Sequence, residues 1–562
     1  MFSSSEHHED CVRKQKDIAQ KFARQMPCAT TLTEEDQRII GLSIPQLVSE
    51  CNSEKLDPAS IMCAYGKRCS SAHSATNCLA DIMLDEAIHK YTPNKSLSGV
   101  PVSLKDCIDL EGHDTTLGYS ANANRPVRES APIVRLLRDA GALLHVKTTV
   151  PTGLFSFETD SDLFGTTTNP YNPKFSPGAS TGGGAALLAY QGSKIEVGTD
   201  SGGSVRYPAA FCGLYALKSS SGRFPTTGCG SSVAGWESVP SVTSPIARKL
   251  EDLAEFWARV VGMKPWEYDP TCVPVPWRPV DLSVATRKPK WGIIWDDGVI
   301  PPTPACTRAL KVAAEVLKKQ GYEVVDFEPP NCLEGLSIGF QLMFADGGAS
   351  ITSPLRSGET INDAVSTVRS VLQLPLFAKR LMATILRYTS RPAGRNDAWA
   401  SLIEVLHPKT ALEERDLVVQ RDAYRAAWYK AMKDQGIDFI LTVPHACPPT
   451  PKGKTGAASL VSANYAFLYN ILDYCAGIVP ITHVDGALDA LPPNFERSEL
   501  YNKLNDAARG TWSIYDAAAM EGLPLSVQVV GGRLEEEKVL EGMRLLKDAL
   551  TACGKGFKPK VF

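Results

Sequence analysis

The sequence lacks three features that would each point to a particular class of protein: a long apolar run, a C-x-x-C pair and a strong excess of one charge. No stretch of its 562 residues approaches the ~18 uninterrupted apolar residues of a membrane-spanning helix. The 59 Lys and Arg nearly balance the 62 Asp and Glu, which gives a formal charge of −3. Such a balance supplies no attraction to nucleic acid or to an anionic membrane surface. We therefore expect neither a membrane span nor a nucleic-acid partner.

Histidine is also scarce, and the nine His include no H-E-x-x-H motif. The fifteen Cys are an odd number, scattered from Cys11 to Cys553 without the close Cys and His spacing of a metal site. A secreted disulfide framework is usually short and evenly paired, and the polar N-terminus shows no apolar segment of a signal peptide. We expect reduced thiols, no bound metal, no cofactor and a cytoplasmic location.

Apolar periodicity predicts an α/β protein. Three N-terminal segments carry apolar residues at helical spacing, namely residues 17–26, 43–51 and 77–90. From residue 98, short strands such as GVPVSLKD, LLHVKTTVP and KIEVGTD alternate with helices, which favours a mixed, largely parallel sheet. Similar strands return late in the chain as DFILTVP and LPLSVQVVGG. One sheet built from both ends of the chain is therefore expected.

The change from helical segments to alternating strands and helices also predicts the domain boundaries. Residues 1–95 should form a helical segment that packs on the core, and residues 96–562 one large α/β domain. Within that domain, residues 98–260 carry the informative motifs, and residues 333–435 read as a mostly helical insertion. The intervening residues 264–290 are rich in Pro and Trp and look like a long surface connection.

Three residues in the first half of the chain could cooperate in nucleophilic catalysis. Lys105 follows an apolar strand, Ser180 lies in the Gly-rich loop PGASTGGGA, and Ser204 ends the turn GTDSGGS. A hydroxyl nucleophile needs a base for its proton and donors for the oxyanion that forms. A lysine can be that base if burial lowers its pKa from ~10.4. We expect activity that rises on the alkaline side of neutrality.

Each feature taken alone has an ordinary explanation. A lysine at a strand end is usually a solvated charge, and Gly-Ser loops are usually plain turns. A phosphate cradle is disfavoured because TGGGA lacks both G-x-G-x-x-G spacing and a G-K-[ST] ending. The string Asp200-Ser201-Gly202-Gly203 matches the GDSGG of trypsin-like proteases, but no suitably placed His is evident. Lys454-Thr455-Gly456 would suit a β-lactamase, yet no Ser-x-x-Lys accompanies it.

Taken together and in this order, the motifs resemble those of the amidase signature family. The loop Gly178-Ala179-Ser180-Thr181-Gly182-Gly183 corresponds to its approximate GGSSGG, GVPVSLKD to its lysine block, and GTDSGGSVRYPA to its G-T-D-x-G-G-S block. Lys105 and Ser180 are 75 residues apart, and Ser180 and Ser204 are 24 apart, which fits the family layout. The resemblance extends from about residue 40 to about residue 545, and PWEYDPTCVPVPWR resembles the fungal acetamidase-type branch.

The resemblance implies a large mixed β-sheet covered by helices on both faces, and a Ser-Ser-Lys triad. Ser204 would attack the amide carbonyl, while Ser180, after a cis Ala179–Ser180 bond, would relay its proton to Lys105. The backbone N–H groups of Ser201, Gly202, Gly203 and Ser204 would form the oxyanion hole, and Ser180 would also contact the substrate. Asp200, Arg206 and Thr181 would support the loops. Ala179 departs from the commonest pattern, which leaves the detailed loop backbone open.

The implied function is hydrolysis of a carboxylic amide to a carboxylate and ammonia or an amine. Alternatives are a fatty-acid or aryl amide hydrolase, a glutamine-dependent amidotransferase subunit and a catalytically inactive binding protein. Candidate acyl-pocket segments are Met343 to Asp346, Val443 to Cys447 and the stretch around Tyr465 and Tyr469, whose composition favours a small or medium apolar acyl group. A homodimer is the default expectation for the oligomeric state, and Cys107 is the thiol nearest the expected base.

Overall fold

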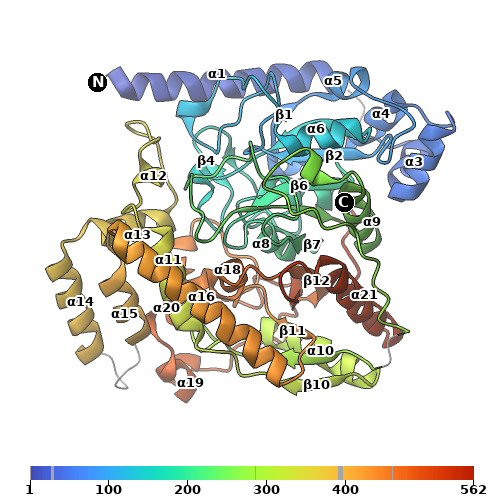
Figure 1. The fold of residues 1–562 in the computed structure, drawn as a ribbon. Helices are drawn as coiled ribbons and strands as arrows, with labels where there is room; N and C mark the ends of the chain where they lie inside the picture. Colours follow the sequence, from blue (N-terminus) through green and yellow to red (C-terminus); the bar gives the residue numbers. More distant parts are fainter. Residues whose placement is uncertain (1, 27–30, 285–286, 390–396, 459) are drawn as a thin grey trace.

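The computed structural model describes the whole chain except residues 1, 27–30, 285–286, 390–396 and 459. It contains one large sheet in the middle of the molecule, and α1 (Phe2–Gln25) lies across the top of the view in Figure 1. Among the described helices, none combines the length and the apolar content needed to cross a membrane. None of the described cysteines is disulfide-bonded.

Eleven strands form the sheet in the order β1-β3-β2-β6-β8-β7-β12-β13-β11-β9-β10. Early strands occupy one side and late strands the other, which confirms the prediction of one sheet built from both ends of the chain. The strands are β1 (Leu79–Ile82), β2 (Pro101–Lys105), β3 (Leu143–Thr148), β6 (Ile195–Asp200), β7 (Tyr215–Lys218), β8 (Val242–Ala247), β9 (Lys290–Ile293), β10 (Glu323–Asp326), β11 (Phe439–Thr442), β12 (Ala476–His483) and β13 (Pro524–Val530); β4 (Asp160–Ser161) and β5 (Gly165–Thr166) form a separate pair.

The prediction of a largely parallel sheet is wrong. Parallel pairing is confined to two groups, β3-β2-β6 and β11-β9-β10. Between them β8, β7, β12 and β13 run antiparallel to their neighbours, and β1 pairs antiparallel at the edge. Parallel neighbours need a crossover connection, usually a helix, and such connections join parallel strands only within these two outer groups. Of the four central strands, the sequence analysis predicted β13 from LPLSVQVVGG, whereas β7, β8 and β12 were not predicted.

Helices cover both faces of the sheet, as β6 illustrates. Its alternate residues point to opposite faces. Glu196 and Gly198 face α7 (Gly182–Ala189) and the loop before it, because a Cβ on Gly184 would lie 2.2 Å from the Glu196 carboxyl carbon. Ile195 and Val197 belong to the main core, together with residues of α9 (Leu250–Gly262).

The N-terminal part is mainly helical but contributes an edge strand. Residues 77–90 were expected to form one helix, whereas residues 79–82 form β1 and only residues 84–89 are helical. The apolar Leu79–Ile82 segment pairs with β3, and this tertiary pairing overrides its local helical pattern. The other early helices are α2 (Glu34–Gly41), α3 (Ile44–Asn52), α4 (Pro58–Thr76), α5 (Leu84–His89) and α6 (Pro132–Asp139).

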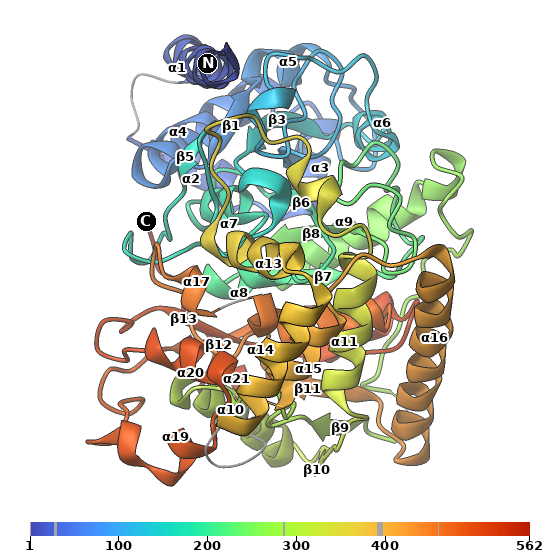
Figure 2. The same ribbon diagram turned by 90° about the vertical axis from the view of Figure 1, so that its left-hand side faces the viewer.

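A group of helices between β10 and β11 lies on one side of the molecule, at the left of Figure 1 and facing the viewer in Figure 2. They are α11 (Cys332–Met343), α12 (Ala349–Thr352), α13 (Asp363–Gln373), α14 (Leu376–Thr389), α15 (Asp397–Val405) and α16 (Ala411–Asp434). The remaining helices are α8 (Arg206–Phe211), α10 (Pro304–Lys319), α17 (Thr455–Ala458), α18 (Asn464–Ile471), α19 (Glu499–Lys503), α20 (Asp506–Ser513) and α21 (Glu536–Ala552).

Candidate active site

Lys105 is fully buried at the carboxyl end of β2, beside the equivalent end of β6. Because the two strands are parallel, their carboxyl ends meet at one edge of the sheet. The Lys105 Nζ donates hydrogen bonds to the Ser180 Oγ at 2.8 Å, and to the Thr199 carbonyl and Oγ1 at 3.0 Å each. Burial lowers the pKa of Lys105, even though neighbouring acidic groups act in the opposite direction. The amine is therefore suited to accept a proton.

Ser180 is held in the loop that leads into α7, after a cis Ala179–Ser180 peptide bond. The glycines of this loop allow α7 to pack very closely on the sheet. A Cβ on Gly183 would lie 2.5 Å from the backbone nitrogen of Thr149, so a side chain would push α7 away. This close packing keeps the Ser180 hydroxyl over the end of β2.

Ser204 lies in the turn between β6 and α8. Gly203 has a φ of +115°, and a Cβ there would lie 2.2 Å from the Tyr207 ring, so only glycine fits the turn. The Ser204 carbonyl accepts a hydrogen bond from the Thr181 N–H at 3.1 Å, which joins the two serine loops. The Ser204 hydroxyl makes no hydrogen bond within the described residues and faces the same hollow as Ser180.

The backbone N–H groups of this turn are not equivalent. The Gly203 N–H donates to the Asp200 Oδ1 at 2.8 Å, so it is turned toward the carboxylate. The N–H groups of Ser201, Gly202 and Ser204 have no hydrogen-bond partner in the described part of the chain. These three groups are the ones available to an oxyanion.

Asp200 and Arg206 form a fully buried ion pair behind the turn, with the Arg206 Nη2 3.0 Å from the Asp200 Oδ1. Burial raises the pKa of Asp200, but the guanidinium more than offsets this and holds the pKa well below its ordinary value. Arg206 also donates to the Ala466 carbonyl and to the Gln528 Oε1, each at 2.8 Å. The pair thus fixes the turn to α18 and β13.

Thr181 contributes to the loops through its backbone. Its N–H bonds to Ser204, and its carbonyl accepts the Ala185 N–H at 3.1 Å. The buried Thr181 Oγ1 has no hydrogen-bond partner among the described residues. The hydroxyl itself therefore does not brace the loop in this structure.

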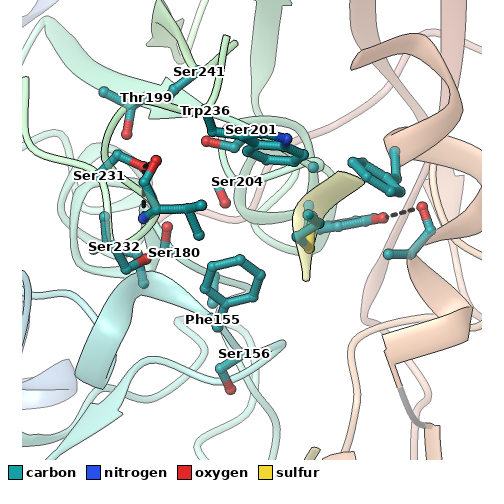
Figure 3. Close-up of a pocket in the computed structure, with 18 of the residues that line it drawn as sticks. Phe155, Ser156, Ser180, Thr199, Ser201, Ser204, Ser231, Ser232, Trp236 and Ser241 are labelled. Atoms are coloured by element: carbon teal, nitrogen blue, oxygen red, sulfur yellow. Dashed lines mark hydrogen bonds between the residues drawn. The ribbon is translucent and has the colours of Figure 1, made fainter. Parts of the chain in front are cut away.

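The hollow above Ser204 has one polar and one apolar side, and encloses about 730 Å³ of empty space including its open mouth. In the view of Figure 3, Ser204 lies between the Trp236 and Phe155 rings, and Ser180, Ser231 and Ser232 lie together on one side of Ser204. The apolar side is lined by Leu154, Phe155, Phe157, Phe340, Met343, Ala463 and Phe467.

Most of the pocket residues predicted from the sequence lie elsewhere. Of residues 343–346 only Met343 lines the hollow, and residues 443–447 do not line it. The predicted stretch around Tyr465 and Tyr469 does contribute to the lining. The two tyrosines themselves do not, because their face of α18 is turned into the core, where the Tyr465 hydroxyl donates to the Ile300 carbonyl at 3.0 Å. Phe467, between them in sequence, faces the hollow instead.

Several residues of the site were not predicted from the sequence, among them residues 230–233, Trp236 and Ser241 of the wall. Thr199, which holds Lys105, lies one residue before the Asp200 of the motif and carries no signal of its own. The wall residues 154–157 follow β3, whose carboxyl end lies beside that of β2, so the strand order would have indicated them. The Cys107 Sγ lies 3.4 Å from the Thr199 Oγ1, behind Lys105.

Comparison with known proteins identifies the family. Residues 60–540 match the family described as Amidase. The chain therefore belongs to the amidase family, and it is a hydrolase of amide bonds.

Among its relatives, the chain is similar to fatty-acid amide hydrolase 1 of Sus scrofa, with 32% identity over 94% of this chain and 88% of the relative. It is also similar to the acetamidase of Emericella nidulans, with 31% identity over 91% of this chain and 89% of the relative. A solved structure of fatty acid amide hydrolase superposes with a TM-score of 0.80 and 25% identity, over 97% of this chain and 95% of that one.

Proposed function

We propose that this amidase acts through an acyl-enzyme on Ser204, with Ser180 and Lys105 completing a Ser-Ser-Lys triad. The observation that carries the proposal is the 2.8 Å hydrogen bond between the buried Lys105 Nζ and the Ser180 Oγ, next to a Ser204 hydroxyl that faces the same hollow. A buried amine of lowered pKa, a bridging hydroxyl and a nucleophilic hydroxyl are the components that such a relay requires.

In the proposed reaction, the Ser204 Oγ forms a bond to the amide carbon while its proton passes to Ser180, and the Ser180 proton passes to Lys105. The carbonyl oxygen becomes an oxyanion, which the N–H groups of Ser201, Gly202 and Ser204 can stabilise. The C–N bond then breaks as the relay returns the proton to the leaving nitrogen. Water attacks the ester through the same relay, which releases the carboxylate and restores Ser204.

The apolar side of the hollow supports an amide with a small or medium apolar acyl group. Aromatic and aliphatic side chains give this side little capacity to compensate a charged acyl group. A longer fatty or aryl acyl group is the second candidate, favoured by the aromatic rings of Phe155, Phe340 and Phe467. We also propose a cytoplasmic enzyme that acts on a small-molecule amide, with a homodimer as the assembly to test.

Labelling with a fluorophosphonate tests the proposed nucleophile. We expect one adduct, on the peptide that contains Ser204, identified by mass spectrometry. Ser204→Ala should abolish both the adduct and amide hydrolysis, and Lys105→Ala should remove most of both. Ser241→Ala is the matched control, because Ser241 lines the same hollow without a place in the relay. An unlabelled Ser204, or full activity in Ser204→Ala, would refute the assignment.

A further inference from the structure

A second buried acidic group, Glu196, lies close to the proposed base and is not used in the relay. Glu196 is fully buried on β6. Its Oε1 accepts a hydrogen bond from the Thr148 Oγ1 at 2.7 Å, while its Oε2 has no hydrogen-bond partner in the described part of the chain. Nor does any described cation form an ion pair with it. Burial of a carboxyl group with one unpartnered oxygen costs free energy, so such a group in a native structure calls for an explanation.

The strand register places Glu196 on the same face of the sheet as Lys105. Glu196 pairs with Ser103 of β2, and Lys105 pairs with Thr148 of β3. Neighbouring residues of paired strands share a face, and steps of two residues along a strand keep it. The Thr148 hydroxyl, which bonds to Glu196, therefore belongs to the same small group of side chains as Lys105.

The first turn of α7 closes this group from above. Gly184 packs so closely on the Glu196 carboxyl that any side chain there would overlap it. α7 begins two residues after Ser180, so the carboxyl lies beneath the segment that carries the bridging serine. Glu196 and Lys105 are thus both fully buried on the face of the sheet that α7 covers.

We propose that Glu196 is a positioning residue for the proposed reaction: through the field of its carboxyl group it sets the charge state in which Lys105 meets Ser180. As a neutral acid it leaves Lys105 free to be an uncharged base, and as a carboxylate it stabilises the ammonium form. The inference rests on the proposed role of Lys105 as the base.

Glu196 is the group near Lys105 that can change charge close to neutral pH. Burial raises the pKa of Glu196 to about 7. Asp200 stays ionised because of Arg206. Burial raises the pKa values of the neighbouring thiols of Cys78, Cys107 and Cys229, so they stay protonated there. α7, with the sequence GGGAALLA, adds no titratable group.

The test is the pH dependence of Ser204 labelling by a fluorophosphonate, a probe that does not require the natural substrate. In this reaction the Ser204 Oγ bonds to phosphorus, the P–F bond breaks, fluoride leaves with the electron pair and the hydroxyl proton goes to the relay. Glu196→Gln removes the charge and keeps the shape. We expect the rising limb of its labelling rate to move to lower pH. Where the wild type reaches about a tenth of its plateau, Glu196→Gln should reach about three-tenths or more.

A purely structural role would lower the plateau or the stability of Glu196→Gln without moving the limb, and an unmoved limb would overturn the inference. Thr148→Val is the second variant, should Glu196→Gln fail to fold. Loss of the Thr148 hydrogen bond disfavours the carboxylate, so its limb should move in the same direction by less. Glu536→Gln, at another fully buried glutamate, should leave the limb in place. Absence of Ser204 labelling in the wild type would instead refute the proposed function.

Discussion

Thr199 gives Lys105 two of its three hydrogen-bond partners, and only one of them depends on the side chain. The backbone carbonyl is fixed by the strand, whereas the Oγ1 can be removed by mutation. A hydrogen bond of this kind contributes ~0.5–1.5 kcal/mol. The hydroxyl should therefore direct the amine toward Ser180 without being essential to the reaction.

We predict that Thr199→Val lowers kcat/KM by about 2- to 10-fold, the equivalent of that hydrogen bond. Steady-state kinetics on a simple amide would measure the loss. Thr243→Val is the matched control, because Thr243 is the buried partner of Thr199 on β8 and its hydroxyl contacts Cys229 rather than Lys105. An equal loss in both variants would show that the effect is general destabilisation.

At the scale of single elements, α18 contributes one face to the hollow and another face to the core. Phe467 faces the hollow, with its ring 5.2 Å from that of Phe340. Tyr465, two residues earlier, faces the core and bonds to the Ile300 carbonyl. Two residues close together on one helix therefore have different roles, Phe467 in the wall of the hollow and Tyr465 in the core.

We predict that Phe467→Ala lowers kcat/KM for amides with apolar acyl groups by about 10- to 100-fold, since the contact of one buried aromatic side chain is worth ~1.5–3 kcal/mol. Tyr465→Phe should instead lower the free energy of unfolding by about 1–2 kcal/mol and leave kcat/KM nearly unchanged. Kinetics and urea unfolding of both variants distinguish these outcomes. The reverse pattern would contradict the assignment of the two faces.

The elements also show how far the sequence was informative. The strands that end at Lys105 and Asp200 were predictable, because a short apolar run bounded by glycine reports local structure directly: Gly99 precedes the first strand, and Gly202 and Gly203 follow the second. The wall of the hollow was not predictable, because the choice between Phe467 and Tyr465 depends on how α18 packs against the core. The same limit applies to residues 79–82, where pairing with β3 decides between strand and helix.

On the scale of the whole molecule, a charged cluster attaches the N-terminal part to the core. Asp81 of β1 accepts hydrogen bonds from Lys21 of α1 and from His113, at 2.7 and 2.8 Å. The other His113 ring nitrogen lies 2.8 Å from the Glu86 Oε2 of α5. Burial lowers the pKa of His113, but the two carboxylates more than offset this, so the pKa is raised.

A raised pKa in the folded state stabilises the protein most where the histidine is charged. The contribution is fully present below the unfolded value of ~6.5 and is lost as the pH rises through the folded value. We predict that His113→Gln lowers Tm more at about pH 5.5 than at about pH 9. Thermal unfolding of both proteins at the two pH values measures this difference. A Tm difference that is constant or larger at alkaline pH would contradict the prediction.

The proposed reacting groups all come from residues 105–204, whereas Phe340 and Met343 of α11 and Phe467 of α18 bring part of the apolar wall from much later in the chain. Substitutions at these three positions can therefore change the wall while Ala466 and Asn470 of α18 keep their hydrogen bonds to Arg206 and Asp200. Over evolutionary time, descendants of such a protein can come to accept different amides while the reaction itself is inherited unchanged. For the same reason, substitution of Phe340, Met343 and Phe467 is the natural first step in redesigning such an enzyme.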